Sequence, residues 1–205
     1  MKIKTLLLGN MQTNGYVVSD ENHHCLIIDP GANGKKVVHY LTENELVPEA
    51  VLLTHGHFDH IGAVDYLYEH YHCPIYLHQD DLEMLDNPQL NLSVYENPFT
   101  VKAPVQSSHE EMKFGDFDVQ WQHLPGHCPG SSMIYLKDEN IIFSGDVLFK
   151  GSIGRFDFPN SSKYETIESI NKIKEYDFDA VIYPGHGPNS TLSEERLNNP
   201  YLKKS

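Results

Sequence analysis

Apolar residues along this chain occur in two patterns, continuous runs and a spacing of three and four positions, and each pattern predicts one type of element. Apolar runs within 50–54 and 180–183 predict strands that are buried on both faces. Segments 35–43, 61–70 and 164–176 carry apolar residues three and four positions apart, which is typical of amphipathic helices. Further strands are predicted at 3–8, 15–19, 25–29, 75–77, 117–124, 132–136 and 141–144, and a further helix at 79–85.

Strands and helices are mixed along the chain, which predicts a layered α/β domain whose helices cover buried strands. The 205 residues are enough for one well-buried domain. No repeat or linker divides them, although 87–104 has the composition of an irregular segment. We therefore expect a single domain over residues 1–205, with a closing helix within 191–202 and no separate C-terminal helical domain.

Charge and cysteine usage narrow the range of partners. The formal net charge is −14, and nucleic acids and anionic membranes are bound through clustered Lys and Arg, so neither is expected as a partner. Three cysteines without CxxC spacing favour a reducing compartment. The apolar stretch at 5–9 is too short for a signal peptide, and no run approaches the ~18 apolar residues of a membrane span. We expect a cytoplasmic protein, whose oligomeric state the sequence leaves open.

The segment 54–60, which reads THGHFDH, places four potential metal ligands within six positions. They are His55, His57, Asp59 and His60. The segment directly follows the buried strand predicted at 50–54, so its ligands are expected at that strand's carboxyl end. Imidazole and carboxylate ligands of this kind hold zinc or iron and activate water, which predicts a metal site.

Three other predicted strands lead through a glycine into a further potential ligand. These ligands are His127 after Gly126, Asp146 after Gly145 and His186 after Gly185. Glycine before a ligand allows backbones to approach closely at strand ends, so we expect the four strand ends to share one site.

Cysteine and histidine residues outside this pattern are expected to play no part in the site. Cys128 follows His127, but adjacent side chains on an extended chain point apart, so a small buried residue is expected there. The remaining histidines, such as His78 and His123, are expected at the surface or hydrogen-bonded.

These motifs together resemble the ordered motif set of the metallo-β-lactamase superfamily, over nearly the whole chain. The resemblance implies a four-layer αββα sandwich of two mixed sheets with metals at one edge. It implies two divalent metal ions, zinc first and iron or manganese as alternatives, the first held by His55, His57 and His127 and the second by Asp59, His60 and His186. Asp146 would bridge the two ions, and Asp59 would also orient the attacking hydroxide.

Within the superfamily, the sequence is more similar to some branches than to others. Asp146 stands where the commonest β-lactamases carry a cysteine, and nuclease relatives need a basic face or an appended domain. The stretch 146–158 is similar to a short bacterial branch of the glyoxalase II group, which hydrolyses hydroxyacyl-glutathione thioesters. In that group a basic residue at the Arg155 position helps to hold glutathione, so Arg155 is expected to bind a substrate carboxylate. Asp157 and the Gly187-Pro188 pair depart from the glutathione-using members.

The expected function is therefore hydrolysis of a small-molecule thioester by a metal-bridging hydroxide, with Asp59 and Asp146 as the catalytic carboxylates. One metal would polarise the carbonyl oxygen and the other would stabilise the departing thiolate. Persulfide dioxygenases also resemble the chain and remain an alternative. They use one iron, held by the counterparts of His55, His127 and Asp146.

Overall fold

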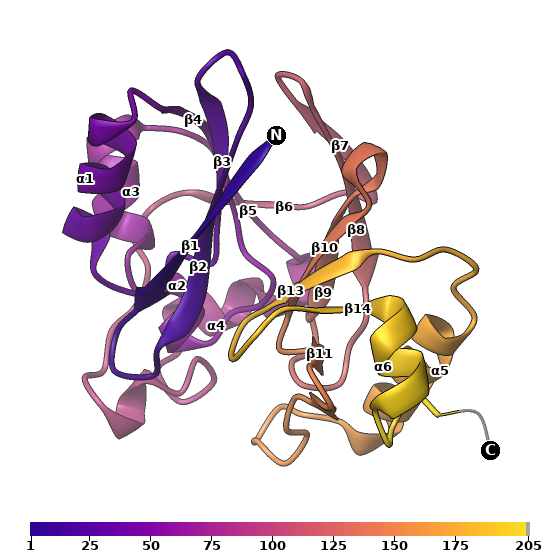
Figure 1. Cartoon of the computed structure of the whole chain (residues 1–205). Coiled ribbons are helices and arrows are strands. Elements are labelled where there is room, and N and C mark those ends of the chain that lie inside the picture. The colour runs from indigo at the N-terminus through magenta and orange to yellow at the C-terminus, as the bar shows by residue number, and fades with distance from the viewer. Residues whose placement is uncertain (204–205) are drawn as a thin grey trace.

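Two six-stranded sheets lie face to face in the computed structural model, which describes residues 1–203 (Figure 1). The first sheet has the order β1-β2-β3-β4-β5-β6. Its strands pair antiparallel from β1 to β3 and parallel from β3 to β6, so the sheet is mixed. The bounds of the strands are Lys2–Leu8, Thr13–Ser19, His24–Ile28, Val47–Leu52, Ile75–Leu77 and Val105–Ser107.

The second sheet is also mixed and has the order β14-β13-β10-β9-β8-β7. Only β10 and β13 pair parallel, and the other neighbours are antiparallel. In chain order from β7, the strands are Glu111–Phe114, Phe117–His123, Ser132–Leu136, Ile141–Gly145, Val181–Pro184 and Ser190–Thr191. A short ribbon of β11 (Leu148–Phe149) and β12 (Ser152–Ile153) stands apart from both sheets.

Alternation along the central strands divides the core into three apolar layers. In β3, Cys25 and Ile27 pack toward α1 (Gly34–Glu43) and α3 (Val64–Tyr71), while Leu26 and Ile28 face the second sheet. The far side of the second sheet packs on α5 (Lys163–Lys174) and α6 (Leu192–Asn198). Helix, sheet, sheet and helix therefore form four layers (Figure 1), which confirms the predicted fold class.

The helix predicted at 61–70 is wrong in its bounds, because the structure has two helices there. They are α2 (Phe58–Ile61) and α3, separated by Gly62 and Ala63. A Cβ at Gly62 would lie 2.2 Å from the Gly31 carbonyl oxygen, so this glycine allows two backbone segments to touch and the helix is interrupted. The predicted helix at 79–85 is a 3₁₀ turn (Gln79–Asp81) followed by α4 (Leu82–Asp86).

Most of the elements that the apolar pattern did not predict are short. They are β6, β7, β11, β12 and β14, with two to four residues each. Such strands are too short to show a period, so their pairing depends on neighbours distant in the sequence. Across residues 1–203, no helix has the length and apolar character needed to cross a membrane.

Candidate metal centre

The structure brings together all seven predicted metal ligands at one edge of the sandwich. Potential ligand atoms of His55, His57 and His127 lie within 4.8 Å of one another. The same limit holds for a second group, Asp59, His60 and His186, and Asp146 lies within it of His55 and His60. The ligands follow the ends of β4, β8, β10 and β13, as the repeated strand-glycine-ligand pattern predicted.

Hydrogen bonds turn the first group of imidazoles toward the centre. His127 Nδ1 donates to the Arg155 carbonyl oxygen at 2.7 Å, which leaves its Nε2 facing His57 Nδ1 at 3.0 Å. The other nitrogen of His57, Nε2, lies 3.3 Å from Cys128 Sγ, and it would donate to the sulfur when Nδ1 binds a metal ion. Lone pairs on His57 Nδ1 and His127 Nε2 therefore converge, as ligation of one ion requires.

A buried aspartate that sequence reasoning missed orients two more histidines. His60 Nδ1 donates to Asp29 Oδ2 at 3.0 Å, so His60 Nε2 faces the centre. His55 Nδ1 donates to Thr54 Oγ1 at 3.1 Å, and that hydroxyl donates to Asp29 Oδ2 at 2.7 Å. Such carboxylate-histidine pairs are usual around bound metals. Asp29 follows a buried strand, as the candidate ligands do, but the Pro-Gly pair after it is typical of a turn and gave no sign of a role in the site.

Asp146 lies between the two groups of ligands. Its Oδ1 is 3.4 Å from His60 Nε2, and its Oδ2 is 3.6 Å from His127 Nε2 and 3.7 Å from His186 Nε2. Asp59 completes the second group, with Oδ2 3.2 Å from His186 Nε2. Thr13 Oγ1 donates to the same Asp59 oxygen at 2.7 Å, a contact that the sequence did not predict.

Three buried polar atoms in the centre have no hydrogen-bond partner within the described residues. They are His55 Nε2, His60 Nε2 and Asp146 Oδ1. An unpaired buried polar atom costs about 1–3 kcal/mol, whereas coordination to a cation satisfies it. Because these atoms belong to predicted ligands and face one another, the donor set fits bound metal ions.

The electrostatics of the centre favour cations as well. Burial and the neighbouring His127 lower the pKa of His57 to about 3, so its imidazole is neutral, the form that binds metals. Burial would lower the pKa of His60, but Asp59, Asp29 and Asp146 outweigh it and raise that pKa well above its usual value. This excess of carboxylate charge around one imidazole is what bound cations would offset.

Two glycines allow the strand ends to meet. A Cβ at Gly185 would lie 2.3 Å from Asp146 Oδ1 and 2.7 Å from His60 Cε1. Gly145 has a φ of +48°, and a Cβ there would lie 2.2 Å from Thr54 Oγ1. These positions confirm that glycine before a ligand serves close approach.

The orientation expected for Cys128 is wrong. Its side chain is fully buried, as expected, but Sγ lies among His55, His57 and His127 rather than away from them. The expectation assumed an extended chain, and this segment is instead a turn, in which the Cys128 amide donates to Ser131 Oγ. Adjacent side chains in a turn can face the same side.

A second buried carboxylate outside the expected set links two ligand-bearing loops. Asp81 accepts hydrogen bonds from the backbone amides of Gly56 (3.0 Å) and Gly130 (2.5 Å). Gly56 lies between His55 and His57, and Gly130 ends the turn that starts at His127. Burial raises the pKa of Asp81 to about 7, although these two N–H groups act in the opposite direction.

Arg155 lies outside the ligand cluster. Its side chain forms a bidentate ion pair with Asp157, with both contacts at 2.9 Å, and its guanidinium lies 4.6 Å from the centre of the Phe158 ring. That ring packs edge-on against His57. Asp157 is thus the partner of Arg155, and a substrate carboxylate would have to displace it.

A fourth group of potential ligands, His78, Asp80 and His123, lies away from the centre. The two imidazole rings stack at 3.7 Å and 14°, so their in-plane lone pairs run side by side instead of converging on one ion. His123 Nε2 donates to the Pro129 carbonyl oxygen at 2.8 Å, as expected for a hydrogen-bonded histidine.

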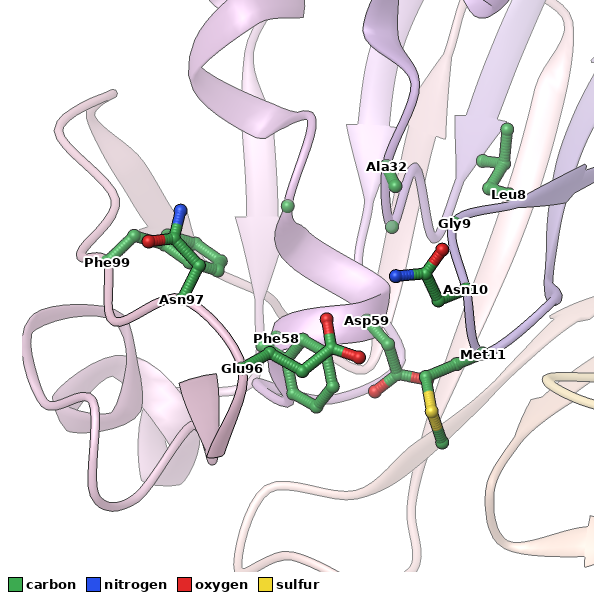
Figure 2. Close-up of a pocket in the computed structure, with 12 residues that line it drawn as sticks. Leu8, Gly9, Asn10, Met11, Ala32, Phe58, Asp59, Glu96, Asn97 and Phe99 are labelled. Carbon is green, nitrogen blue, oxygen red and sulfur yellow. The ribbon is translucent and has the colours of Figure 1, made fainter. Parts of the chain in front are cut away.

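A pocket opens beside Asp59 (Figure 2). It encloses about 230 Å³ and is walled by the turn 8–11, by Phe58 and Asp59 at the start of α2, and by the loop 96–99. Glycines and Ala32 complete its lining.

Comparison with sequences of known proteins places the chain among metal-dependent hydrolases. The model of a family described as the metallo-beta-lactamase superfamily matches residues 8–186. The chain is 39% identical to the probable metallo-hydrolase YqgX of Bacillus subtilis, with 98% of each chain covered. It is 31% identical to the hydroxyacylglutathione hydrolase GloC of Haemophilus influenzae, again with 98% of each covered.

Solved structures agree with this placement. The BLEG-1 B3 metallo-beta-lactamase superposes with a TM-score of 0.93 at 37% identity, covering 99% of this chain and all of that one. TTHA1623 in a di-iron-bound form superposes with a TM-score of 0.87 at 36% identity, covering 97% and 100%.

Proposed function

Because the chain belongs to the metallo-beta-lactamase superfamily of metal-dependent hydrolases, we propose that it hydrolyses a small-molecule thioester at a centre of two divalent metal ions. The observation that supports two ions is the position of Asp146, whose carboxylate oxygens lie within 3.7 Å of histidines from both ligand groups. The thioester is supported by the full-length similarity to GloC.

The proposed ligands of the first ion are His55, His57 and His127, and those of the second are Asp59, His60 and His186, with Asp146 shared. Zinc is the first choice for this nitrogen and oxygen donor set, and iron or manganese would suit it as well. Iron is further supported by the di-iron form of TTHA1623.

The chemistry divides between the ions and the chain. Bound ions would supply a hydroxide nucleophile near neutral pH and polarise the acyl carbonyl. Asp59, which Thr13 holds in place, orients the attacking water. A thiolate leaves without much protonation, so no general acid is needed.

Arg155 is the proposed contact for a substrate carboxylate, because a guanidinium binds carboxylates bidentately. Arg155→Ala should raise KM for a carboxylate-bearing thioester about tenfold and leave the metal content unchanged. An unchanged KM would remove Arg155 from the substrate site and leave the ion pair with Asp157 as its role.

We place this reaction in the cytoplasm, because all three cysteines are free and buried, as suits a reducing compartment. The proposed partner is thus a small cytoplasmic metabolite.

The test is cleavage of S-lactoylglutathione by metal-replete protein, with oxygen uptake on glutathione persulfide and turnover of a chromogenic β-lactam measured alongside. Thioester cleavage far faster than the other two reactions is the expected result. Oxygen uptake without hydrolysis would indicate an iron dioxygenase that uses His55, His127 and Asp146. Preferred β-lactam turnover, as the name of BLEG-1 suggests for that relative, would also contradict the proposal.

A further inference from the structure

A second cavity lies against α5, on the outer side of the second sheet. It encloses about 290 Å³, close to the lower end of the ~300–1,000 Å³ that is usual for small-molecule sites. One wall is a face of α5, and the opposite wall consists of Ile153 at the end of β12, Phe156, and Tyr201 after α6. None of the seven candidate metal ligands is part of its lining.

The wall that α5 provides follows the helical period. Its residues stand at positions i, i+3, i+4, i+7, i+8 and i+11, which share one face of a helix. They are Lys163, Thr166, Ile167, Ile170, Asn171 and Lys174. The other residues of α5 that carry charge lie outside the cavity, so this face has its own composition.

Apolar side chains form the middle of the cavity. They are Ile153, Phe156, Ile167, Ile170 and Tyr201. Ile170 is buried, but Ile167 is 50% exposed and Tyr201 is 46% exposed, so part of this apolar surface remains in contact with water. A hydrocarbon chain that covered it would gain about 25 cal/mol for each Å² removed from water.

The charged groups of the cavity are both cations, although the net charge of the chain is −14. Lys163 and Lys174 stand at the two ends of the α5 wall, eleven positions apart, which is about three turns and about 16 Å along the helix axis. Within residues 1–203 the ion pairs of Lys and Arg side chains involve Lys113, Lys150 and Arg155, so neither cation of the cavity is paired. Both are therefore available to an anionic ligand.

The cavity is separate from the candidate metal centre. Thr166 and Ile170 line the cavity, and they also line a small void beside His127 and Asp146. That void encloses about 10 Å³, which is at the limit for a single water molecule. A chain bound against α5 therefore does not reach the metal positions through it.

We propose that this cavity binds an aliphatic dicarboxylate. Its chain would cover Ile167 and Ile170, and its two carboxylates would pair with Lys163 and Lys174. The order of cation, apolar surface and cation along α5 is complementary to a ligand with an anion at each end of an apolar chain. The enclosed volume favours a small molecule of this kind over a protein segment. The inference does not depend on the proposed thioester hydrolysis.

The test is a titration of metal-replete protein, labelled at its isoleucine methyl groups, with octanedioate. The NMR signals of Ile153, Ile167 and Ile170 should shift together and reach saturation. Octanoate, which has one carboxylate, should bind about threefold more weakly, and 1,8-octanediol, which has the same chain length and no charge, about tenfold more weakly.

Variants on α5 test each part of the site. Lys163→Gln and Lys174→Gln should each weaken the binding of octanedioate about threefold, the size expected of one exposed ion pair. Ile167→Ser should weaken it about fivefold, because the apolar contact is lost at a position that is half exposed. Lys172→Gln, an exposed lysine of the same helix outside the cavity, is the matched control and should leave the affinity unchanged.

Three results would overturn the proposal. The first is the absence of a saturable shift at the three methyl groups, and the second is equal affinity for octanedioate and octanediol. The third is binding that the two lysine variants do not weaken, as would be found if the carboxylates bound to the metal ions instead. Shifts of the same signals that depend on protein concentration without any ligand would show that a second copy covers this face, which would also contradict the proposal.

Discussion

Asp146 is the residue whose position decides how many metal ions the centre holds. Its carboxylate lies between His60 on one side and His127 and His186 on the other, and its buried Oδ1 has no hydrogen-bond partner within the described residues. A carboxylate in this place can be shared by two cations, and it offsets their mutual repulsion.

Replacement of this carboxylate should therefore remove metal and activity together. Asp146→Ala is expected to lose at least one equivalent of bound metal, measured by elemental analysis, and to lower kcat by about 100-fold or more. Asp138→Ala, which removes an exposed carboxylate at the far end of β10's hairpin, is the control. Full metal retention in Asp146→Ala would contradict the bridging role.

Cys128 acts on the centre through His57. Its sulfur lies 3.3 Å from Nε2 of that imidazole, where it would accept the Nε2 proton and favour the tautomer whose Nδ1 faces His127 and can bind a metal ion. Cys128→Ala should lower metal affinity about 10- to 100-fold in a chelator competition, and Cys128→Ser should restore part of it because a hydroxyl also accepts. The buried Cys25, which lies in the outer layer of the first sheet, provides the control Cys25→Ala. Equal affinities in wild type and Cys128→Ala would show that the contact is only packing.

At this scale the sequence could predict which side chains converge but not the residues that orient them. Each group of candidate ligands comes shortly after an apolar strand, and that signal lies within a few consecutive residues. The roles of Asp29, Thr13 and Cys128 depend instead on which strand ends meet and on a turn conformation. Neither of these can be inferred from the local sequence.

At the scale of elements, the turn before α4 connects two loops that carry candidate ligands and fixes their positions relative to each other. Asp81 reaches both Gly56 and Gly130 through backbone hydrogen bonds, so it connects the segment after β4 in one sheet with the segment after β8 in the other. The predicted helix at 79–85 covers this element. The prediction did not include the hydrogen bonds of Asp81, whose partners Gly56 and Gly130 lie 25 and 49 positions away along the chain.

The raised pKa of Asp81 gives this link a pH dependence. The folded-state pKa of about 7 lies above the ~3.9 of an unfolded aspartate. At a pH between these two values, Asp81 therefore keeps its proton in the folded protein and has lost it in the unfolded chain. The stability contribution is fully present below pH ~4 and is lost as the pH rises through 7. Between pH 5 and 8, titration of Asp81 should lower the free energy of unfolding of the wild-type protein. In Asp81→Asn the decrease over the same range should be smaller by at least about 1 kcal/mol. Parallel pH profiles from denaturant titrations would contradict this assignment.

At the scale of the whole molecule, the candidate metal centre joins the two sheets. The proposed ligands after β4 extend from the first sheet, and those after β8, β10 and β13 extend from the second. A layered arrangement was predictable because central strands such as β4 and β10 are apolar on both faces and so require a layer on each side. The four-layer form was predicted only from the resemblance of the motifs to the superfamily. The short edge strands were not predictable, because they form only against neighbours that the sequence places far away.

The central claim is a thioester hydrolase that needs two metal ions on one chain. The measurement that tests it most directly is a titration of metal-free protein with Zn²⁺, with hydrolysis of S-lactoylglutathione followed at each step. Activity should rise until two equivalents are bound and then stay constant. Saturation at one equivalent, or full zinc loading without hydrolysis, would contradict the account.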